Sequence, residues 1–153
     1  MAFIILQGDA LHIPLADESV QCAPTSPPYF GLRNYGLPPT DWPEVEYAPM
    51  PGLPPIVIPA MTCCLGLEET PEAYTAHLVA VFREVWRVLR KDGVVWLNLG
   101  DSYAGYHGNS RVADDDAPSN KPGYIENMRA TTVGMSGLKP KDLCGIPWRV
   151  ALA

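Results

Sequence analysis

Long apolar runs are missing from this sequence. Its 153 residues are 47% hydrophobic and 18% charged, which allows one domain with a core, but no stretch approaches the roughly 18 consecutive apolar residues of a membrane helix. The apolar residues 2–6 have no basic segment before them and are followed at once by Gly8-Asp9, which is atypical of a signal peptide. We therefore interpret residues 2–6 as a first, buried strand, and we expect a cytoplasmic protein without a membrane partner.

Metal-binding patterns are missing as well. The four cysteines show no C-x-x-C spacing and have no histidine pair nearby, so we expect no metal site. Reduced, unpaired cysteines are typical of the cytosol. Cys63 and Cys64 are interpreted as packed thiols on opposite faces of a short extended segment. The three histidines lack mutual spacing and are interpreted as structural or exposed.

Basic residues are scarce in the first half of the chain. Up to Phe82, Arg33 is the only base beside nine acids, whereas ten bases and eight acids follow. The net charge of −6 argues mildly against a nucleic-acid partner, and a basic footprint could lie only in the second half. Charge alone therefore does not indicate DNA binding.

The clearest elements of the sequence form a strand–helix–strand unit. The segment 19–25 predicts a strand, which Pro27 and Pro28 end because neither can donate to a sheet. Residues 71–90 predict a helix, with an N-cap threonine, a proline at the first position and apolar side chains at spacings of three and four. A strand at 94–99 follows. Strand, long helix and strand with short joints indicate a parallel crossover and hence the α/β class.

Two other segments predict little regular structure. Eight prolines within residues 37–62 exclude regular elements there, so we interpret this segment as an extended surface loop. Trp42 and Tyr47 within it could staple the loop down or grip a partner. The polar, glycine-rich residues 104–140 are typical of a mobile loop or insertion, and an amphipathic helix begins at Ile146.

Polar groups occur at all three predicted strand ends. In open α/β sheets, ligands bind beyond the carboxyl ends of the strands. The three ends here are Gly8-Asp9, Thr25–Tyr29 and Gly100-Asp101. Because polar groups are unfavourable in a buried core, these ends are candidate ligand positions, although Asp9 could instead cap a turn.

The turn Ser26-Pro27-Pro28-Tyr29 combines rigid hydrogen-bond acceptors with an aromatic ring. Each proline fixes its φ angle and lacks an N–H group, so the carbonyls beside the prolines point in set directions. With the Ser26 hydroxyl they can accept hydrogen bonds from an amino group on a planar ring, and Tyr29 can stack on that ring. Such an amine is a poor nucleophile because its lone pair is delocalised, and acceptors at its N–H bonds favour the pyramidal geometry that attacks a methyl group held in line. By itself, the tetrapeptide could also be a proline-rich turn or a ligand for an aromatic groove.

Thr25–Tyr29, followed by Phe30-Gly31-Leu32-Arg33-Asn34-Tyr35-Gly36, resembles the catalytic motif region of the exocyclic-amino DNA methyltransferases. Further segments along nearly the whole chain are similar to the same family: residues 8–10, 82–93, 97–103, 138–143 and 146–149. The serine of the motif resembles the cytosine-N4 branch, whereas the adenine-N6 branch more often has Asp or Asn there. The resemblance implies a partial Rossmann-like, S-adenosylmethionine-dependent methyltransferase fold with parallel strands and a long crossover helix.

The resemblance also implies roles for individual residues. The four residues of the turn are implied to be catalytic: Ser26, Pro27, Pro28 and Tyr29. Three polar residues at strand ends are implied to lie on the cofactor side: Asp9, Thr25 and Asp101. Two residues after the turn are implied to contact nucleic acid, Arg33 and Tyr35, although Arg33 could also be a solvated charge. The implied partner is double-stranded DNA with a cytosine flipped out of the duplex, whose unstacking is offset by stacking on the tyrosine.

One element of the family is missing from the sequence. In the permuted order that the chain resembles, a glycine-rich S-adenosylmethionine loop, Phe-x-Gly-x-Gly, lies downstream of the catalytic motif, and the sequence contains none. Residues 1–153 therefore resemble an incomplete catalytic domain, the N-terminal portion of a longer enzyme from a restriction-modification system or a phage. The alternatives are a split enzyme whose second chain supplies the loop, and an inactive remnant, alone or as a homo-oligomer.

Overall fold

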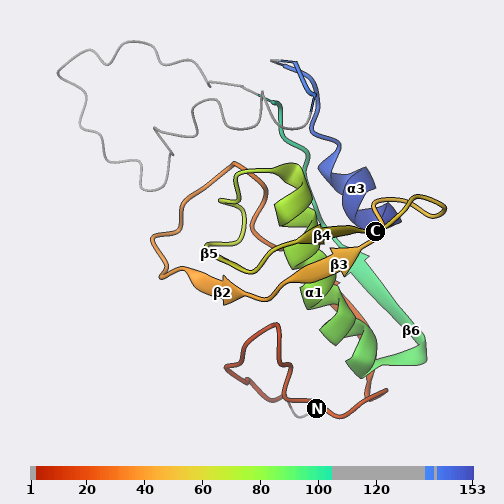
Figure 1. The fold of residues 1–153 in the computed structure, drawn as a ribbon. Coiled ribbons are helices and arrows are strands. Elements are labelled where there is room, and N and C mark those ends of the chain that lie inside the picture. Colours follow the sequence, from red (N-terminus) through yellow and green to blue (C-terminus); the bar gives the residue numbers. More distant parts are fainter. Residues whose placement is uncertain (1–2, 105–136, 140) are drawn as a thin grey trace.

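The computed structural model describes residues 3–104, 137–139 and 141–153 (Figure 1). The predicted loop or insertion at 104–140 lies almost wholly outside the described residues. The elements in chain order are β1 (Val20–Thr25), β2 (Thr40–Trp42), β3 (Val45–Tyr47), β4 (Ile56–Ile58), β5 (Met61–Cys63), α1 (Pro71–Val88), β6 (Leu89–Leu97) and α3 (Ile146–Leu152). No helix of the described residues is long and apolar enough to cross a membrane.

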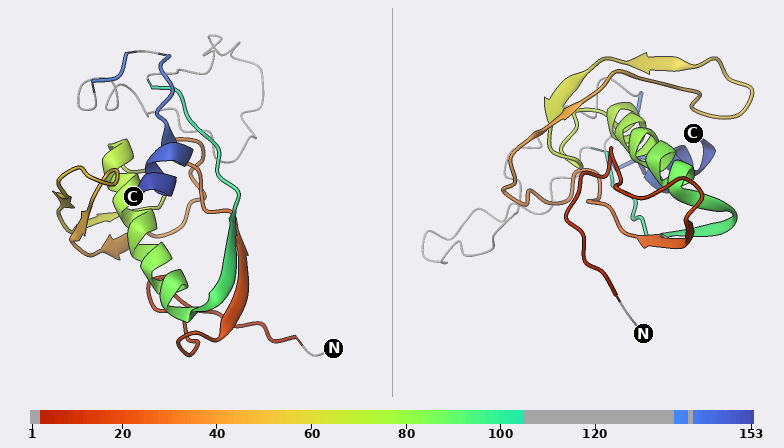
Figure 2. Two further views of the ribbon diagram at one scale, coloured as in Figure 1. Left: turned by 90° about the vertical axis from the view of Figure 1, so that its right-hand side faces the viewer. Right: turned by 90° about the horizontal axis from the view of Figure 1, so that it is seen from below.

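The parallel pairing of β1 with β6, connected through α1, confirms the α/β class. The two strands run in register from Cys22 opposite Val94 to Thr25 opposite Leu97. The helix α1 begins where the sequence predicts, because the Thr70 side chain accepts a hydrogen bond from the Ala73 amide at 3.1 Å. The views of Figure 2 show α1 between the β1–β6 pair and the short strands that precede it.

The boundary between α1 and β6 differs from the prediction. The helix ends at Val88 rather than at residue 90, because Leu89 is extended (φ −75°, ψ 136°) and already pairs with Val20. Pairing then shifts register, so the residues between Leu89 and Val94 form an irregular part of β6. Residues 90–93 therefore lie in the irregular part of β6 and not at the end of the helix.

The expected first strand is not formed by the described residues. Residues 3–8 are in no strand, and Phe3 and Ile5 are each 86% exposed. Residue 2 lies outside the described residues. A strand needs a hydrogen-bonded neighbour, and no described segment pairs with residues 3–8. The prediction of a buried strand at residues 2–6 is therefore wrong for the part that the structure describes.

The proline-rich segment contains regular structure, contrary to the prediction. Within it, β2 pairs with β5 and β3 pairs with β4, both antiparallel. These strands are only three residues long, and all eight prolines fall between or outside them, where a missing N–H breaks no ladder. The connection from β1 to α1 contains these four short strands and is therefore not one of the short joints that the sequence predicted.

One tryptophan side chain and one tyrosine side chain hold this segment against α1. Trp42 is 6% exposed and donates its indole N–H to the Cys63 carbonyl at 3.0 Å. Tyr47 is 5% exposed, and its hydroxyl donates to the Glu72 carbonyl at 3.2 Å. The interpretation of these side chains as staples is confirmed.

The buried core surrounds the first half of α1. One cluster joins the helix to the segment after β1 and to α3, and its buried members are Phe30, Tyr74, Leu78, Ala104, Cys144 and Ile146. A second cluster joins the helix to β3 and β4 through Val45, Tyr47 and Ala76. The N-terminal half of α1 is therefore the element against which the other parts pack.

Replacing the central core side chain tests this arrangement. Leu78 is fully buried, so Leu78→Ala should lower the free energy of unfolding by about 2–5 kcal/mol through lost burial and a residual cavity. Urea denaturation followed by circular dichroism measures this change. The matched control is Leu53→Ala, which alters a side chain that is 50% exposed and should change the free energy of unfolding by less than about 0.5 kcal/mol. Equal effects of the two substitutions would contradict this core.

Candidate active site at the end of strand β1

The turn Ser26–Tyr29 leaves the sheet where β1 and β6 both end. The Thr25 carbonyl accepts the last hydrogen bond of the pair, from the Asn98 amide at 2.9 Å. Pro27 and Pro28 then follow, and neither has an N–H to extend the ladder. The turn therefore occupies the carboxyl end of the parallel pair, which is where ligands bind in open α/β sheets.

Three hydrogen bonds to backbone carbonyls or amides fix the chain around this turn. The Tyr74 hydroxyl of α1 donates to the Pro28 carbonyl at 2.8 Å. The Gly31 amide donates to the Gly66 carbonyl at 2.8 Å, and the Ser102 hydroxyl donates to the carbonyl of the buried Phe30. Three segments distant in sequence therefore hold one short turn.

The Tyr74 hydroxyl is the donor in its hydrogen bond to the Pro28 carbonyl. The side chain is fully buried, and burial, followed by the nearby Glu68 carboxylate, raises the pKa of Tyr74 above its usual range. The hydroxyl therefore keeps its proton and acts as a donor. The Pro28 carbonyl therefore has one of its two lone pairs engaged by Tyr74.

Two glycines allow the turn to pack closely. Gly66 has φ +90°, and a Cβ on it would lie 2.8 Å from the Tyr29 carbonyl oxygen. A Cβ on Gly100 would lie 2.8 Å from the Tyr29 ring. The ring of Tyr29 therefore rests against the backbone that follows β6, and any side chain at either glycine would displace it.

The remaining acceptors of the turn face no protein donor among the described residues. Ser26 is exposed, and no described group donates to its hydroxyl or to the carbonyls of Ser26 and Pro27. Beside Ser26 is a shallow cavity of about 540 Å³. It is lined by Pro24, Thr25, Ser26, Trp96, Leu97 and Asn98. Thr25 thus lies where the sequence predicts, next to a recess with unused acceptors.

Asp101 accepts backbone hydrogen bonds that connect the segment after β6 to α3. Its carboxylate accepts hydrogen bonds from the amides of Ser102 at 2.8 Å, Ile146 at 3.0 Å and Gly145 at 3.1 Å. The last two amides are at the start of α3, whose N-cap Gly145 has no side chain to cap it. Asp101 therefore caps α3 from a distant part of the sequence. A role for it on the cofactor side stays a prediction.

The structure does not bring Asp9 to the turn. Asp9 accepts a hydrogen bond from the Leu11 amide at 2.9 Å and contacts His12, so it closes a local turn. The next residues are bound to the C-terminal end of α1, where the Ile13 amide donates to Glu84 at 3.2 Å. The segment after Asp9 therefore lies at the C-terminal end of α1, beside the amino end of β1, where Val20 pairs with Leu89, and not at the end that carries Ser26.

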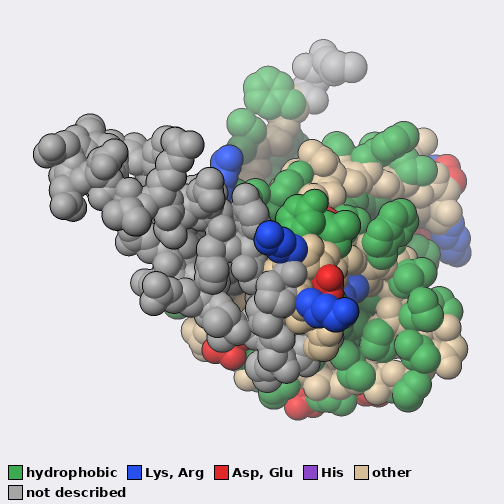
Figure 3. All heavy atoms as spheres, turned by 90° about the horizontal axis from the view of Figure 1, so that it is seen from above, with side chains coloured by type: hydrophobic (Ala, Val, Ile, Leu, Met, Phe, Trp, Pro, Cys, Tyr) green, Lys and Arg blue, Asp and Glu red, His purple; other side chains and the backbone are tan. Residues whose placement is uncertain are grey.

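The residues expected to contact nucleic acid are on the surface after the turn. Arg33 is exposed and Tyr35 is 57% exposed. Neither forms a hydrogen bond or ion pair with the residues that the structure describes. In the view of Figure 3, basic side chains are few and hydrophobic ones cover much of the coloured surface. The contact with DNA therefore stays a prediction.

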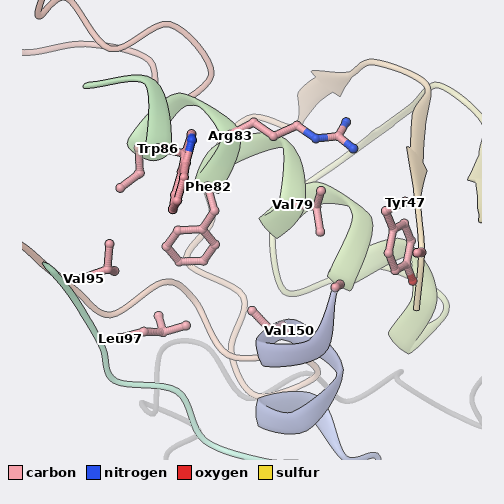
Figure 4. Close-up of a pocket in the computed structure, with 11 residues that line it drawn as sticks. Tyr47, Val79, Phe82, Arg83, Trp86, Val95, Leu97 and Val150 are labelled. Carbon is pink, nitrogen blue, oxygen red and sulfur yellow. The ribbon is translucent and has the colours of Figure 1, made fainter. Parts of the chain in front are cut away.

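A larger apolar groove lies between α1, β6 and α3 and shares one lining residue, Leu97, with the recess beside Ser26. It has a volume of about 630 Å³ and is lined mostly by hydrophobic side chains. Figure 4 shows Phe82 and Trp86 of α1 on one side, Val95 and Leu97 of β6 opposite them, and Val150 of α3 at one end. Its only charged lining group, Arg83, donates to the Glu46 carbonyl. Its lining residues include no carboxylate, imidazole or thiol side chain.

Sequence reasoning missed the groups that support the turn. Tyr74 lies within the predicted helix, but nothing in the local pattern indicates that its hydroxyl reaches Pro28, which is 46 residues away. The contacts of Gly66 and Ser102 also join segments that are distant in the sequence. Only the paired strands bring these segments together.

Comparison with known proteins identifies relatives along nearly the whole chain. The chain is 39% identical over 151 residues to the Type II methyltransferase M.XycI of Xanthomonas campestris pv. cyanopsidis, covering 97% of this chain and 40% of that protein. It is 38% identical to the Type II methyltransferase M.SmaI of Serratia marcescens, covering 97% and 41%, and 35% identical to M.Cfr9I of Citrobacter freundii, covering 97% and 40%. The chain thus spans about two fifths of the length of these relatives. No protein-family model and no solved structure matches it.

The structural role of Asp101 can be measured without any ligand. Asp101→Ala removes the acceptor of three backbone amides and should lower the free energy of unfolding by about 1–2 kcal/mol, as for a lost helix cap. The control is Asp92→Ala, since Asp92 is exposed and pairs only with Arg90; its loss should cost less than about 0.5 kcal/mol. Urea denaturation checks both values. An Asp101 variant as stable as the unsubstituted chain would show that this carboxylate is not a cap.

Proposed function

We propose that the chain, similar over 97% of its length to Type II methyltransferases, is the target-base half of such an enzyme. In this proposal the complete protein transfers a methyl group from S-adenosylmethionine to the N4 amine of a cytosine in double-stranded DNA. The observation that carries the proposal is the turn Ser26-Pro27-Pro28-Tyr29, which is held rigidly while its outer acceptors have no donor among the described residues. The relatives' Type II designation supports a restriction-modification setting.

The turn can bind an amino group on a flat ring. The Ser26 hydroxyl and the Pro27 carbonyl are the acceptors with no donor among the described residues, whereas the Pro28 carbonyl already accepts from Tyr74. The Tyr29 ring, held against Gly100, provides a stacking surface beside them. Two acceptors directed at the two N–H bonds of an amine favour its pyramidal geometry, in which the lone pair is not delocalised into the ring. Because these acceptors are fixed, they need no reorganisation during the reaction. A base must leave the duplex to reach them.

Two of the three residues implied to lie on the cofactor side have other contacts in the structure. Asp101 already accepts three backbone amides, and Asp9 accepts the Leu11 amide in a local turn. The sequence also lacks the Phe-x-Gly-x-Gly loop that the resemblance implies. We therefore assign the methyl donor to the part of the relatives' length that this chain does not span, and the chain alone should bind it weakly or not at all.

The apolar groove supports a division of the enzyme into complementary parts. Among the residues that line the groove, Trp86 is 79% exposed and Val95 39%, and exposed apolar surface of this kind marks an interaction site. In the described residues, β1 and β6 form a sheet of only two strands. We propose that the rest of the methyltransferase covers this groove, either as a continuation of the same polypeptide or as a second chain.

Replacing the serine of the turn tests the catalytic assignment. A complete enzyme can be assembled by joining the chain to the part of M.XycI that it does not match. In this chimera Ser26→Ala should lower DNA methylation roughly 100-fold, as for loss of one positioned hydrogen-bonding group. The matched control is Ser19→Ala, at the other end of β1, whose hydroxyl donates to the Ala16 carbonyl at 2.6 Å. Its activity should be unchanged.

The modified base identifies the target. Nuclease digestion of the methylated DNA followed by mass spectrometry should give N4-methylcytosine. N6-methyladenine would instead support the adenine branch, and equal activity of Ser26→Ala and Ser19→Ala would remove the turn from the mechanism.

A substitution in the groove tests the division into parts. Trp86→Glu places a charge on the apolar surface and should weaken association of the chain with the separately expressed remainder of M.XycI by roughly 30-fold or more. Isothermal titration calorimetry measures this affinity. The control is Val57→Glu, in β4, where the side chain is 54% exposed and does not line the groove. If both variants bind equally well, the groove is not the interface.

A further inference from the structure

A thiol, a carboxylate and an imidazole that the proposed reaction does not use converge beside the turn. They belong to Cys63 at the end of β5, Glu68 in the loop after it and His77 in α1. One ligand atom from each lies within 4.8 Å of the other two. The sequence predicted no metal site because the cysteines lack a C-x-x-C pattern, but folding brings together donors that are 14 residues apart in the chain.

The distances between these donors are close to those of a tetrahedral zinc ion. With Zn–S near 2.3 Å and Zn–N or Zn–O near 2.1 Å, a tetrahedral ion separates its S and N ligands by about 3.5 Å and its N and O ligands by about 3.4 Å. In the structure, Cys63 Sγ and His77 Nδ1 are 4.0 Å apart, and His77 Nδ1 and Glu68 Oε1 are 2.8 Å apart. Shifts of about half an ångström or slightly more would match both distances, within reach of small side-chain rotations.

The buried charges favour a divalent cation. Glu68 is 1% exposed, and among the described residues no lysine or arginine pairs with it. Its ion-pair partner among these residues is His77, at 2.8 Å, which is a cation only when it is protonated. Beside a neutral imidazole, a buried carboxylate is unfavourable. Zn²⁺ bound by one thiolate, one carboxylate and one neutral imidazole gives a site with no net charge. Thiolate and imidazole are also ligands that suit zinc.

Among the described residues, the His77 imidazole makes polar contacts only with Glu68 and Cys63. Trp42 stacks on the His77 ring, with centroids 4.2 Å apart and planes at 11°. His77 is fully buried, and its Nε2 has no hydrogen-bond partner among the described residues. All polar contacts of the ring therefore pass through Nδ1, toward Glu68 and Cys63.

We propose that Cys63, Glu68 and His77 bind a zinc ion, with water as the fourth ligand. The ion would tie β5 to α1 and fix the loop between them. The second carboxylate oxygen of Glu68 accepts the Gly66 amide at 2.8 Å, and the Gly66 carbonyl accepts the Gly31 amide. Zinc at this position therefore stabilises the loop that supports the Ser26–Tyr29 turn. The site stands on its own residues and does not depend on methyl transfer.

Cobalt titration of the chelator-treated chain tests the site. Co²⁺ should bind with one-to-one stoichiometry and give a near-ultraviolet sulfur-to-cobalt charge-transfer band, which Zn²⁺ should abolish by displacement. Cys63→Ser should remove the band and weaken binding roughly 100-fold. The matched control is Cys22→Ser, because Cys22 is exposed and outside the cluster. Absence of stoichiometric binding, or a band that survives in Cys63→Ser, would overturn the proposal.

Thiol alkylation of the unsubstituted chain gives a second test that needs no variant. At a Zn²⁺ concentration about ten times the dissociation constant, alkylation of Cys63 by iodoacetamide should slow roughly tenfold, while Cys22 should react at its original rate. Peptide mass spectrometry measures the two rates separately. An unchanged rate at Cys63 would mean that the three side chains form only a buried hydrogen-bonded cluster.

Discussion

Two consecutive prolines at the end of β1 impose the constraint around which this structure is organised. Because Pro27 and Pro28 cannot donate hydrogen bonds, the backbone there cannot be held by sheet pairing. It is held instead through carbonyl groups and close packing. Tyr74 donates to the Pro28 carbonyl, and Gly100 lies against the Tyr29 ring. The result is a rigid turn whose remaining acceptors are directed away from the protein core.

In the proposed enzyme, this turn binds the target base and another part of the protein binds the methyl donor. In the proposal the turn holds and activates an amino group, and the methyl donor is bound by the part of the relatives' length that this chain does not span. The apolar groove formed by α1, β6 and α3 shares Leu97 with the recess beside Ser26 and is otherwise lined by different residues. We propose that the rest of the enzyme covers that groove and leaves the base-binding turn open to DNA. This proposal agrees with a chain that spans two fifths of the length of its relatives.

Local signals in the sequence predicted those parts of the fold that depend on neighbouring residues. The cap and proline at Thr70 and Pro71 give the start of α1, and the double proline gives the end of β1. The exit from α1 was missed because Leu89 leaves the helix to pair with Val20, a contact between distant segments. The proline-rich segment was missed for a related reason, since its short strands form by pairing across a loop.

The candidate site also contains some residues that the sequence predicts and others that only the fold reveals. Ser26 to Tyr29 could be predicted because their chemistry lies in consecutive residues. The support from Tyr74, the capping by Asp101 and the cluster of Cys63, Glu68 and His77 could not, because each joins residues that only the fold brings together. Asp9 was assigned to the site from a strand end that the described residues do not form.

The most direct test of the central claim is a structure of the completed enzyme bound to a DNA duplex that contains its target site. Our account predicts a cytosine outside the duplex, with its amino nitrogen within hydrogen-bonding distance of the Ser26 hydroxyl and the Pro27 carbonyl and its ring stacked on Tyr29. A target base bound elsewhere, with Ser26 facing only solvent, would contradict it.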